Sequence, residues 1–201
     1  MTLKDAKLNF VIDIATALFL ERSVSSVTIK DIAKASGLGE ATIYRYFSGR
    51  GELLVACALK LQEKVGSIFI DGTEGLSGFA RIEKFYKAYL SAFRESPELY
   101  RFLYEFDAYC ISEKLTGLEE YADNMDAFRE AFLSAYRDGV ADGSVKEICD
   151  PSLFYFSTAH ALLSLCKKLA VEGALLRQDE SLDKGAEIGM MIDVILASLR
   201  A

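Results

Sequence analysis

The sequence contains little that would interrupt a helix. Its 201 residues include only two prolines, Pro97 and Pro151, whereas the good helix formers Leu, Ala, Glu and Lys are frequent. Two short β-rich runs, at 27–29 and 67–70, each lie inside a helical hydrophobic period. We therefore expect an all-α protein without strands, and the apolar spacing predicts about nine helices.

The sequence also lacks a long apolar run. Its most apolar stretches, at 53–59 and 190–196, are far shorter than the roughly 18 residues that suggest a membrane span. No uninterrupted apolar segment with a small-residue cleavage site follows the first residues, so we expect no signal peptide. The four cysteines form no C-x-x-C pair, which is typical of free, mostly buried thiols in a reducing compartment. We expect a cytoplasmic protein with no membrane partner.

Groups that perform catalysis are scarce. His160 is the single histidine, and no H-E-x-x-H, G-x-S-x-G or phosphate-binding loop occurs. Gly37 and Gly39 follow no strand and lack a third glycine, which argues against a dinucleotide fingerprint. A metal site of His160, Cys166 and a carboxylate is an alternative, but a lone histidine on an apolar helix is more often a core residue or a ligand contact. We expect no enzyme activity, cofactor or metal.

Positive charge is scarce overall but unevenly distributed. The net charge is −7, which by itself argues against a nucleic-acid partner. Residues 1–50, however, hold seven Lys or Arg and five Asp or Glu, a net charge of +2, against −9 for the remainder. Only the N-terminal segment is therefore expected to approach a polyanion.

That same segment has the spacing of a helix-turn-helix unit. An amphipathic helix is expected at 5–21, and Thr28, with Asp31 three residues later, resembles the capping box that begins a helix. Gly37 supplies the left-handed conformation that ends this second helix, and a third is expected from about residue 39 or 40 to Tyr46. In such units the last helix enters the DNA major groove.

The residue types of the third helix suit DNA. Arg45 can reach a base edge or a phosphate, Thr42 can touch a thymine methyl or a phosphate, and Tyr44 and Tyr46 can donate their hydroxyls to phosphates. Thr28 and the free amides of the helix that follows it offer a further phosphate contact, and Arg50 adds a cation. The pattern alone leaves open a plain helical hairpin in which Tyr44 and Phe47 are core residues.

From residue 15 to residue 54 the sequence resembles the TetR (tetracycline repressor) family of bacterial transcriptional regulators. The residues that carry the resemblance are Phe19, Thr28, Asp31-Ile32-Ala33, Gly37, Ala41-Thr42-Ile43-Tyr44, Tyr46-Phe47, Arg50 and Leu53-Leu54. The resemblance implies a homodimer in which residues 1–49 form a helix-turn-helix domain that binds an operator in double-stranded DNA. Residues 50–201 would form a larger helical domain for effector binding and dimerisation.

The resemblance also implies roles for individual residues. Lys30 would read a base, and Arg50 would bind a phosphate. The third helix would present to DNA all its residues except the inward Ile43, namely Glu40, Ala41, Thr42, Tyr44, Arg45 and Tyr46.

Several positions depart from the family pattern. Gly39 stands where a capping Ser is usual, Glu40 stands where a Lys is common, and Gly51 stands where a Glu is usual. Glycine is an acceptable cap, but Glu40 would repel phosphate unless it accepts a hydrogen bond from a base amine. These departures motivate an alternative function, a helical interaction protein whose DNA-binding surface has decayed.

Aromatic side chains are dense between residues 85 and 156. Most are expected to form an ordinary core, while some would line an effector pocket between helices. A buried carboxylate at Glu105 or Asp107 would need a partner. The predicted pocket residues are Tyr89, Tyr104, Glu105, Tyr109, Phe128 and His160.

The last two helices, at about 152–172 and 182–199, are apolar nearly all round. A helix of this kind must be covered on both sides, so we expect these two to form a homodimer interface. The expected function is a repressor that binds a palindrome as a dimer and is released by a small-molecule effector, with the helix at 51–70 as the lever.

Overall fold

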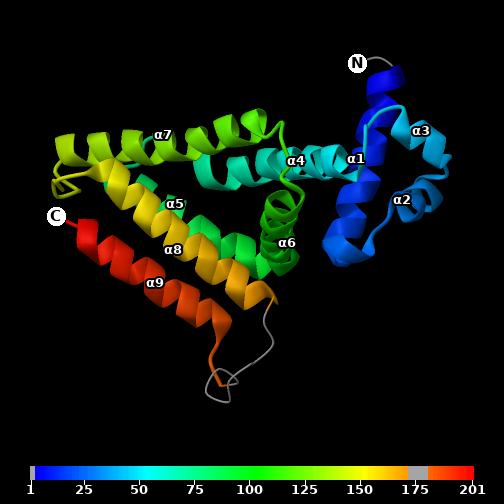
Figure 1. Cartoon of the computed structure of the whole chain (residues 1–201). Helices are drawn as coiled ribbons and strands as arrows, with labels where there is room; N and C mark the ends of the chain where they lie inside the picture. The colour runs from blue at the N-terminus through cyan, green and yellow to red at the C-terminus, as the bar shows by residue number, and fades with distance from the viewer. Residues whose placement is uncertain (1–2, 172–180) are drawn as a thin grey trace.

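The computed structural model describes residues 3–171 and 181–201, and these ranges contain nine α-helices and no strand (Figure 1). The all-α prediction and the predicted number of helices are therefore confirmed. Residue 172, at the edge of the expected dimer interface, lies outside the described residues. The helices are α1 (Leu3–Glu21), α2 (Ile29–Ser36), α3 (Glu40–Tyr44), α4 (Arg50–Ile70), α5 (Gly78–Glu95), α6 (Pro97–Glu113), α7 (Glu119–Ala141), α8 (Pro151–Val171) and α9 (Lys184–Leu199), with a 3-10 turn, η1 (Val24–Ser26).

The first three helices form a small head around an apolar centre. Val11, Phe19, Ile32 and Ile43 are buried in it. The predicted capping box is present, because the Thr28 hydroxyl accepts from the Asp31 amide at 3.2 Å and the Asp31 carboxylate accepts from the Thr28 amide at 2.9 Å. The chain then turns at Gly37, whose φ of +70° is left-handed as predicted.

Helix α3 is shorter than predicted, since it ends at Tyr44 and not at Tyr46. The amide of Tyr46 donates to the Ile43 carbonyl at 2.9 Å, which tightens the last turn. Phe47, buried beside the head core, holds the chain in this turn. Arg45 and Tyr46 therefore project from the turn that follows α3.

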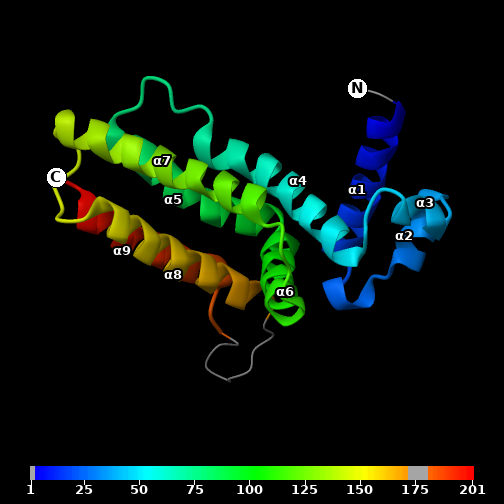
Figure 2. The same cartoon turned by 45° about the horizontal axis from the view of Figure 1, so that its top comes forward.

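Helix α4 joins the head to a larger body (Figures 1 and 2). Its first half contacts α1, where Lys60 pairs with Asp13 and the Cys57 thiol lies 3.8 Å from the Ile12 carbonyl. Its second half packs against α5 and α7 in the body. The boundary predicted at residue 49/50 coincides with the start of α4, but this helix belongs to both halves.

The body packs α5 at its centre, in contact with α4, α6, α7, α8 and α9. Phe85, Tyr86 and Phe132 are buried there among other rings, as an ordinary aromatic core requires. Helices α5 and α7 approach closely at two glycines. A Cβ atom on Gly78 would lie 2.0 Å from the backbone nitrogen of Gly139, so this crossing admits no side chain.

Helices α8 and α9 lie side by side on the outside of the body in both cartoon views. One side of the pair packs on the body through Leu162, Cys166 and Ile192. The other side exposes large apolar side chains, among them Leu153, Phe156, Met190 and Val194. A groove between the two helices, lined by Leu165 and Met190 among others, adds to this apolar surface.

Candidate functional site

The outer side of α3 and the start of α2 form the candidate DNA-binding surface. Tyr44 is 53% exposed, and Lys30, Glu40, Ala41 and Arg45 are also exposed. Thr42 and Tyr46 are half-buried beside them. The helical period explains this division, because Ile43 and Phe47, four residues apart, point into the head core. Phe47 is thus a core residue and Tyr44 is not, which excludes a plain hairpin with Tyr44 in its core.

Two cations of this surface are available to a phosphate. Neither Lys30 nor Arg45 forms an ion pair with any residue that the structure describes. The Arg45 guanidinium lies 5.6 Å from the centre of the Tyr46 ring, a cation–π distance that holds it beside the end of α3. The guanidinium protons remain free for an anion.

Thr28 is exposed, but its hydroxyl is already engaged. It accepts from the Asp31 amide and donates to the Asp31 carboxylate. This side-chain hydrogen bond is the main reason that the pKa of Asp31 lies below its usual value. A phosphate at this helix N-terminus would compete with the Asp31 carboxylate for the same donors.

Arg50 lies between the head and the body. Its guanidinium donates to the Val24 carbonyl and lies 5.1 Å from the centre of the Tyr109 ring. In this conformation the two interactions direct Arg50 toward η1 and α6, so its predicted phosphate contact requires a different rotamer.

One side of α6 holds the head through a set of contacts that we call the joint. Arg101 donates to the carbonyls of Leu20 and Arg22, and Glu105 accepts from the Val24 amide. Arg101, Glu105 and Tyr109 recur at every fourth residue, so they share one side of the helix. Sequence reasoning missed Arg101, although this spacing was visible.

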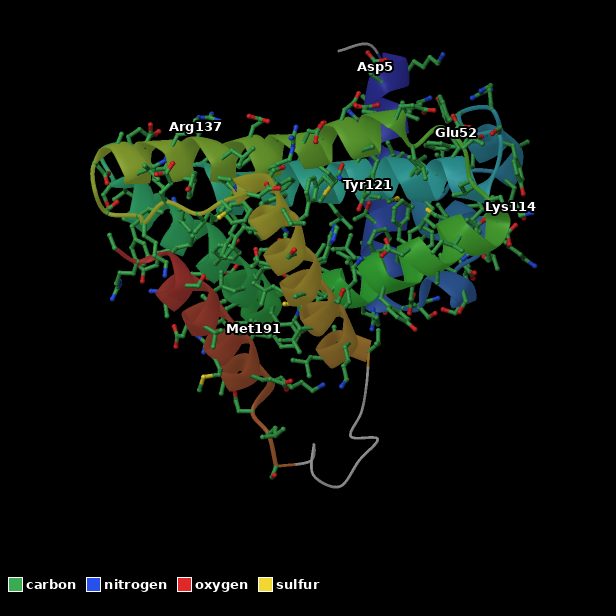
Figure 3. The ribbon with its side chains drawn as sticks, turned by 60° about the vertical axis from the view of Figure 1, so that its left-hand side comes forward. Asp5, Glu52, Lys114, Tyr121, Arg137 and Met191 are labelled. Carbon is green, nitrogen blue, oxygen red and sulfur yellow. The ribbon has the colours of Figure 1, made fainter. Side chains whose placement is uncertain are left out.

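A cavity of about 80 Å³ lies inside the body, lined by residues of α4, α5, α6, α7 and α8. Tyr89 and Phe128, which were predicted to line a pocket, do line it. The sequence did not single out the other polar or ring-bearing lining residues, which are Gln62, Phe69, Tyr100, Tyr121, Tyr155 and Lys167. Figure 3 labels Tyr121 near the centre of the body.

The other four predicted pocket residues do not line this cavity. Tyr104 is half exposed to solvent, and Glu105 and Tyr109 belong to the joint. His160 is exposed on the outer side of α8, 5.8 Å from the Phe156 ring centre. The structure places these four outside this cavity, because aromatic density marks a helix without showing which of its sides faces inward.

The polar groups of the cavity are mostly neutral donors. Gln62 donates its amide to the Tyr121 carbonyl at 3.1 Å, and Tyr100 donates its hydroxyl to the Tyr89 carbonyl at 3.0 Å. Burial raises the pKa of Tyr155 to about 12 and raises that of Tyr121 as well, so both hydroxyls keep their protons at neutral pH.

The charged group of the cavity is Lys167. Its side chain is only 14% exposed, and its Nζ donates to the carboxylate of Asp107, which is 50% exposed. This pair links α8 to α6 at the edge of the cavity. Among the residues described, no cluster of His, Cys, Asp and Glu could hold a metal ion, and no helix is both long and apolar enough to cross a membrane.

The chain is similar to known regulators of transcription. Residues 11–57 match the family described as "Bacterial regulatory proteins, tetR family". The HTH-type transcriptional regulator AlkX of Mycobacterium tuberculosis is 34% identical over 84 residues, which cover 42% of this chain and 37% of AlkX. The HTH-type transcriptional repressor KstR2 of Rhodococcus jostii is 28% identical over 158 residues, which cover 76% of this chain and 74% of KstR2.

Solved structures of regulators assigned to the same family share the fold of this chain. A crystal structure of a Mesorhizobium loti protein assigned to the TetR family superposes with a TM-score of 0.73 at 17% identity, covering 100% of both chains. Together with the exposed surface of α3, these similarities define a helix-turn-helix DNA-binding protein with a helical body. The family match in the head, the curated relatives and the shared fold together support a TetR-family transcriptional regulator.

Proposed function

We propose that the chain is a repressor that binds a palindromic operator as a homodimer and leaves it when a small-molecule effector enters the body. Residues 1–49 would bind DNA, and residues 50–201 would bind the effector and dimerise. The observation that carries the proposal is the exposed pair Tyr44 and Arg45 in an N-terminal segment, residues 1–50, of net charge +2, in a chain of net charge −7. The cytoplasm, which holds the operator, is the proposed location.

The operator contacts follow from the exposed surface. Arg45 and Lys30 would bind bases or phosphates, and Tyr44 would donate to a phosphate. The remaining proposed contacts are Thr28, Glu40, Ala41, Thr42, Tyr46 and, after a rotamer change, Arg50. Glu40 would accept from a base amine, because it otherwise repels the backbone.

The dimer would form through α8 and α9. Leu153, Phe156, Met190 and Val194 are each more than 40% exposed on this pair of helices, and several exposed apolar side chains on neighbouring helices are typical of an interface. A second copy of the chain is the proposed occupant, since a two-fold axis would place two heads on one duplex. Half-sites would then lie roughly 34 Å or a little more apart.

Release would occur by a shift between two conformations. The cavity is lined by α4 and α6, and both helices also contact the head. An effector that binds better to a body with displaced α4 and α6 would favour a conformation in which the two heads are wrongly spaced. Operator affinity would then fall by the ratio of the effector's affinities for the two conformations.

The test is enrichment of fragmented genomic DNA by the purified protein. We expect one palindrome to be enriched, and we expect Tyr44→Ala and Arg45→Ala each to lose it while melting at the unchanged temperature. Tyr104→Ala and Arg137→Ala are matched controls, because both side chains are exposed and belong to the body. Failure to enrich any sequence at low salt would contradict the proposal and favour a helical interaction protein with a decayed DNA-binding surface.

A further inference from the structure

Lys167 occupies an unusual position for a cation. It is the one basic side chain among the residues that line the cavity in the described part of the chain, and only 14% of it reaches solvent. Its ion-pair partner, Asp107, is half exposed and does not line the cavity. A mostly buried ammonium needs an anion beside it, and here that anion can be hydrated and replaced.

The walls behind Lys167 are apolar. They include Phe69, Leu99, Leu103, Met125, Phe128 and Leu163, which come from four of the five helices that line the cavity. A ligand that fits both features carries an apolar chain and a single negative head. Because Lys167 already binds a carboxylate, the arrangement suits a carboxylate head.

We propose that the effector is an amphipathic monocarboxylic acid. Its apolar chain would occupy the cavity, and its carboxylate would replace that of Asp107 at Lys167. Calling this ligand an effector rests on the proposed function, but its binding to the chain can be measured without DNA. The cavity volume of about 80 Å³ favours a slender chain, and side chains such as the partly exposed Met125 would move to admit it.

The exchange at Lys167 would act on the head through α6. At 100° per residue, Asp107 and Leu103 lie on one side of α6, and the joint residues Arg101, Glu105 and Tyr109 lie on the opposite side. The ion pair of Asp107 with Lys167 ties α6 to α8. A ligand carboxylate that takes over Lys167 would release this tie while the joint still holds the head, so that α6 and the head would move together.

The experiment is isothermal titration calorimetry of the full chain with octanoic acid and with 1-octanol, which share a chain and differ in charge. We expect the wild type to bind the acid about ten-fold more tightly than the alcohol, since only the carboxylate can replace the charge-assisted hydrogen bond of Asp107 at Lys167 while water hydrates the half-exposed Asp107. Lys167→Met should lose this preference by binding the acid about ten-fold more weakly. Asp107→Asn should bind the acid more tightly than the wild type, because the competing carboxylate is gone.

Lys168→Met is the matched control, since Lys168 is the exposed neighbour on α8 and does not line the cavity. It should bind both ligands as the wild type does, and thermal melts of all variants should show that each is folded. Equal affinity for acid and alcohol in the wild type, or an unchanged affinity of Lys167→Met for the acid, would overturn the proposal. A chain that binds the acid but enriches no DNA would instead contradict the proposed function.

Discussion

The four cysteine thiols lie in different surroundings, which gives each a different reactivity. Cys57 and Cys166 are buried, Cys110 is half-buried and Cys149 is exposed. Burial raises the pKa of Cys57 and of Cys166 to about 12, so both remain protonated at pH 8. Burial, and secondarily the Asp107 carboxylate, also raise the pKa of Cys110.

We therefore predict one rapidly reacting thiol in each native chain. With a colorimetric disulfide reagent at pH 8, Cys149 should react first and Cys110 more slowly. Cys57 and Cys166 should react only after guanidinium unfolds the protein. Cys149→Ser should remove the fast phase, and four equally fast thiols in the native protein would contradict the burial on which the prediction depends.

Single residues could be predicted from the sequence where their partners are close in the chain. The outward Tyr44 and Arg45 and the inward Ile43 follow from helical spacing, and the Thr28 cap follows from Asp31 three residues away. The positions of Arg50 and Glu105 could not be predicted in this way. Their shared partner, Val24, lies 26 and 81 residues away, and only the tertiary fold brings it near.

At the scale of helices, the crossing of α5 and α7 provides a sharp test of packing. A methyl group on Gly78 would meet the backbone of Gly139, which cannot rotate away as a side chain could. We predict that Gly78→Ala destabilises the protein by about 1–3 kcal/mol, as overpacking does. The measurement is the free energy of unfolding from denaturant titration by circular dichroism.

The control for this substitution is Gly66→Ala on α4. A Cβ there would meet no atom within 4 Å, and the residue is inside a helix. Alanine should therefore stabilise the protein by about 0.5–1 kcal/mol through helix propensity. If both substitutions changed the stability by the same amount, the close contact between α5 and α7 would not exist as described.

The helices themselves were largely predictable, because their limits depend on local signals. Capping at Thr28, Gly37 as the end of α2, and Pro97 and Pro151 as first residues all agree with the structure. The error at the end of α3 arose because Phe47 is held by the core of the head. Local sequence carries no information about such a distant contact.

At the scale of the whole molecule, the exposed apolar surface of α8 and α9 should decide the oligomeric state. Met190 and Val194 are 67% and 60% exposed, four residues apart on one side of α9. We predict that Met190→Glu combined with Val194→Glu converts a dimer into a monomer, because four carboxylates would be buried at a two-fold contact. Analytical ultracentrifugation measures this directly.

The double variant should also lose most of its operator affinity, since the two heads would no longer be linked. Ile111→Glu is the matched control, because Ile111 is 78% exposed near the end of α6 and belongs to neither α8 nor α9. It should remain dimeric. A dimeric Met190→Glu, Val194→Glu protein would place the interface on another surface.

The cavity was the least predictable feature of the molecule. Five helices line it, so its position depends on how their sides face one another. The density of aromatic residues pointed to the body, and two of the residues chosen on that basis, Tyr89 and Phe128, line the cavity. Lys167 was not identified, because its partner Asp107 lies 60 residues away on another helix.

The joint between head and body determines whether the head of one protein can be exchanged for that of another. The polar contacts of Arg101 and Glu105 in the joint, and that of the neighbouring Arg50, are made to carbonyl and amide groups of 20–24, and not to side chains there. Every protein backbone offers these groups, so the side chains of the head can differ while the body still forms the same hydrogen bonds to it. A head taken from a relative with another operator should graft onto this body, and the resulting chimera would report the same chemical signal at a new promoter.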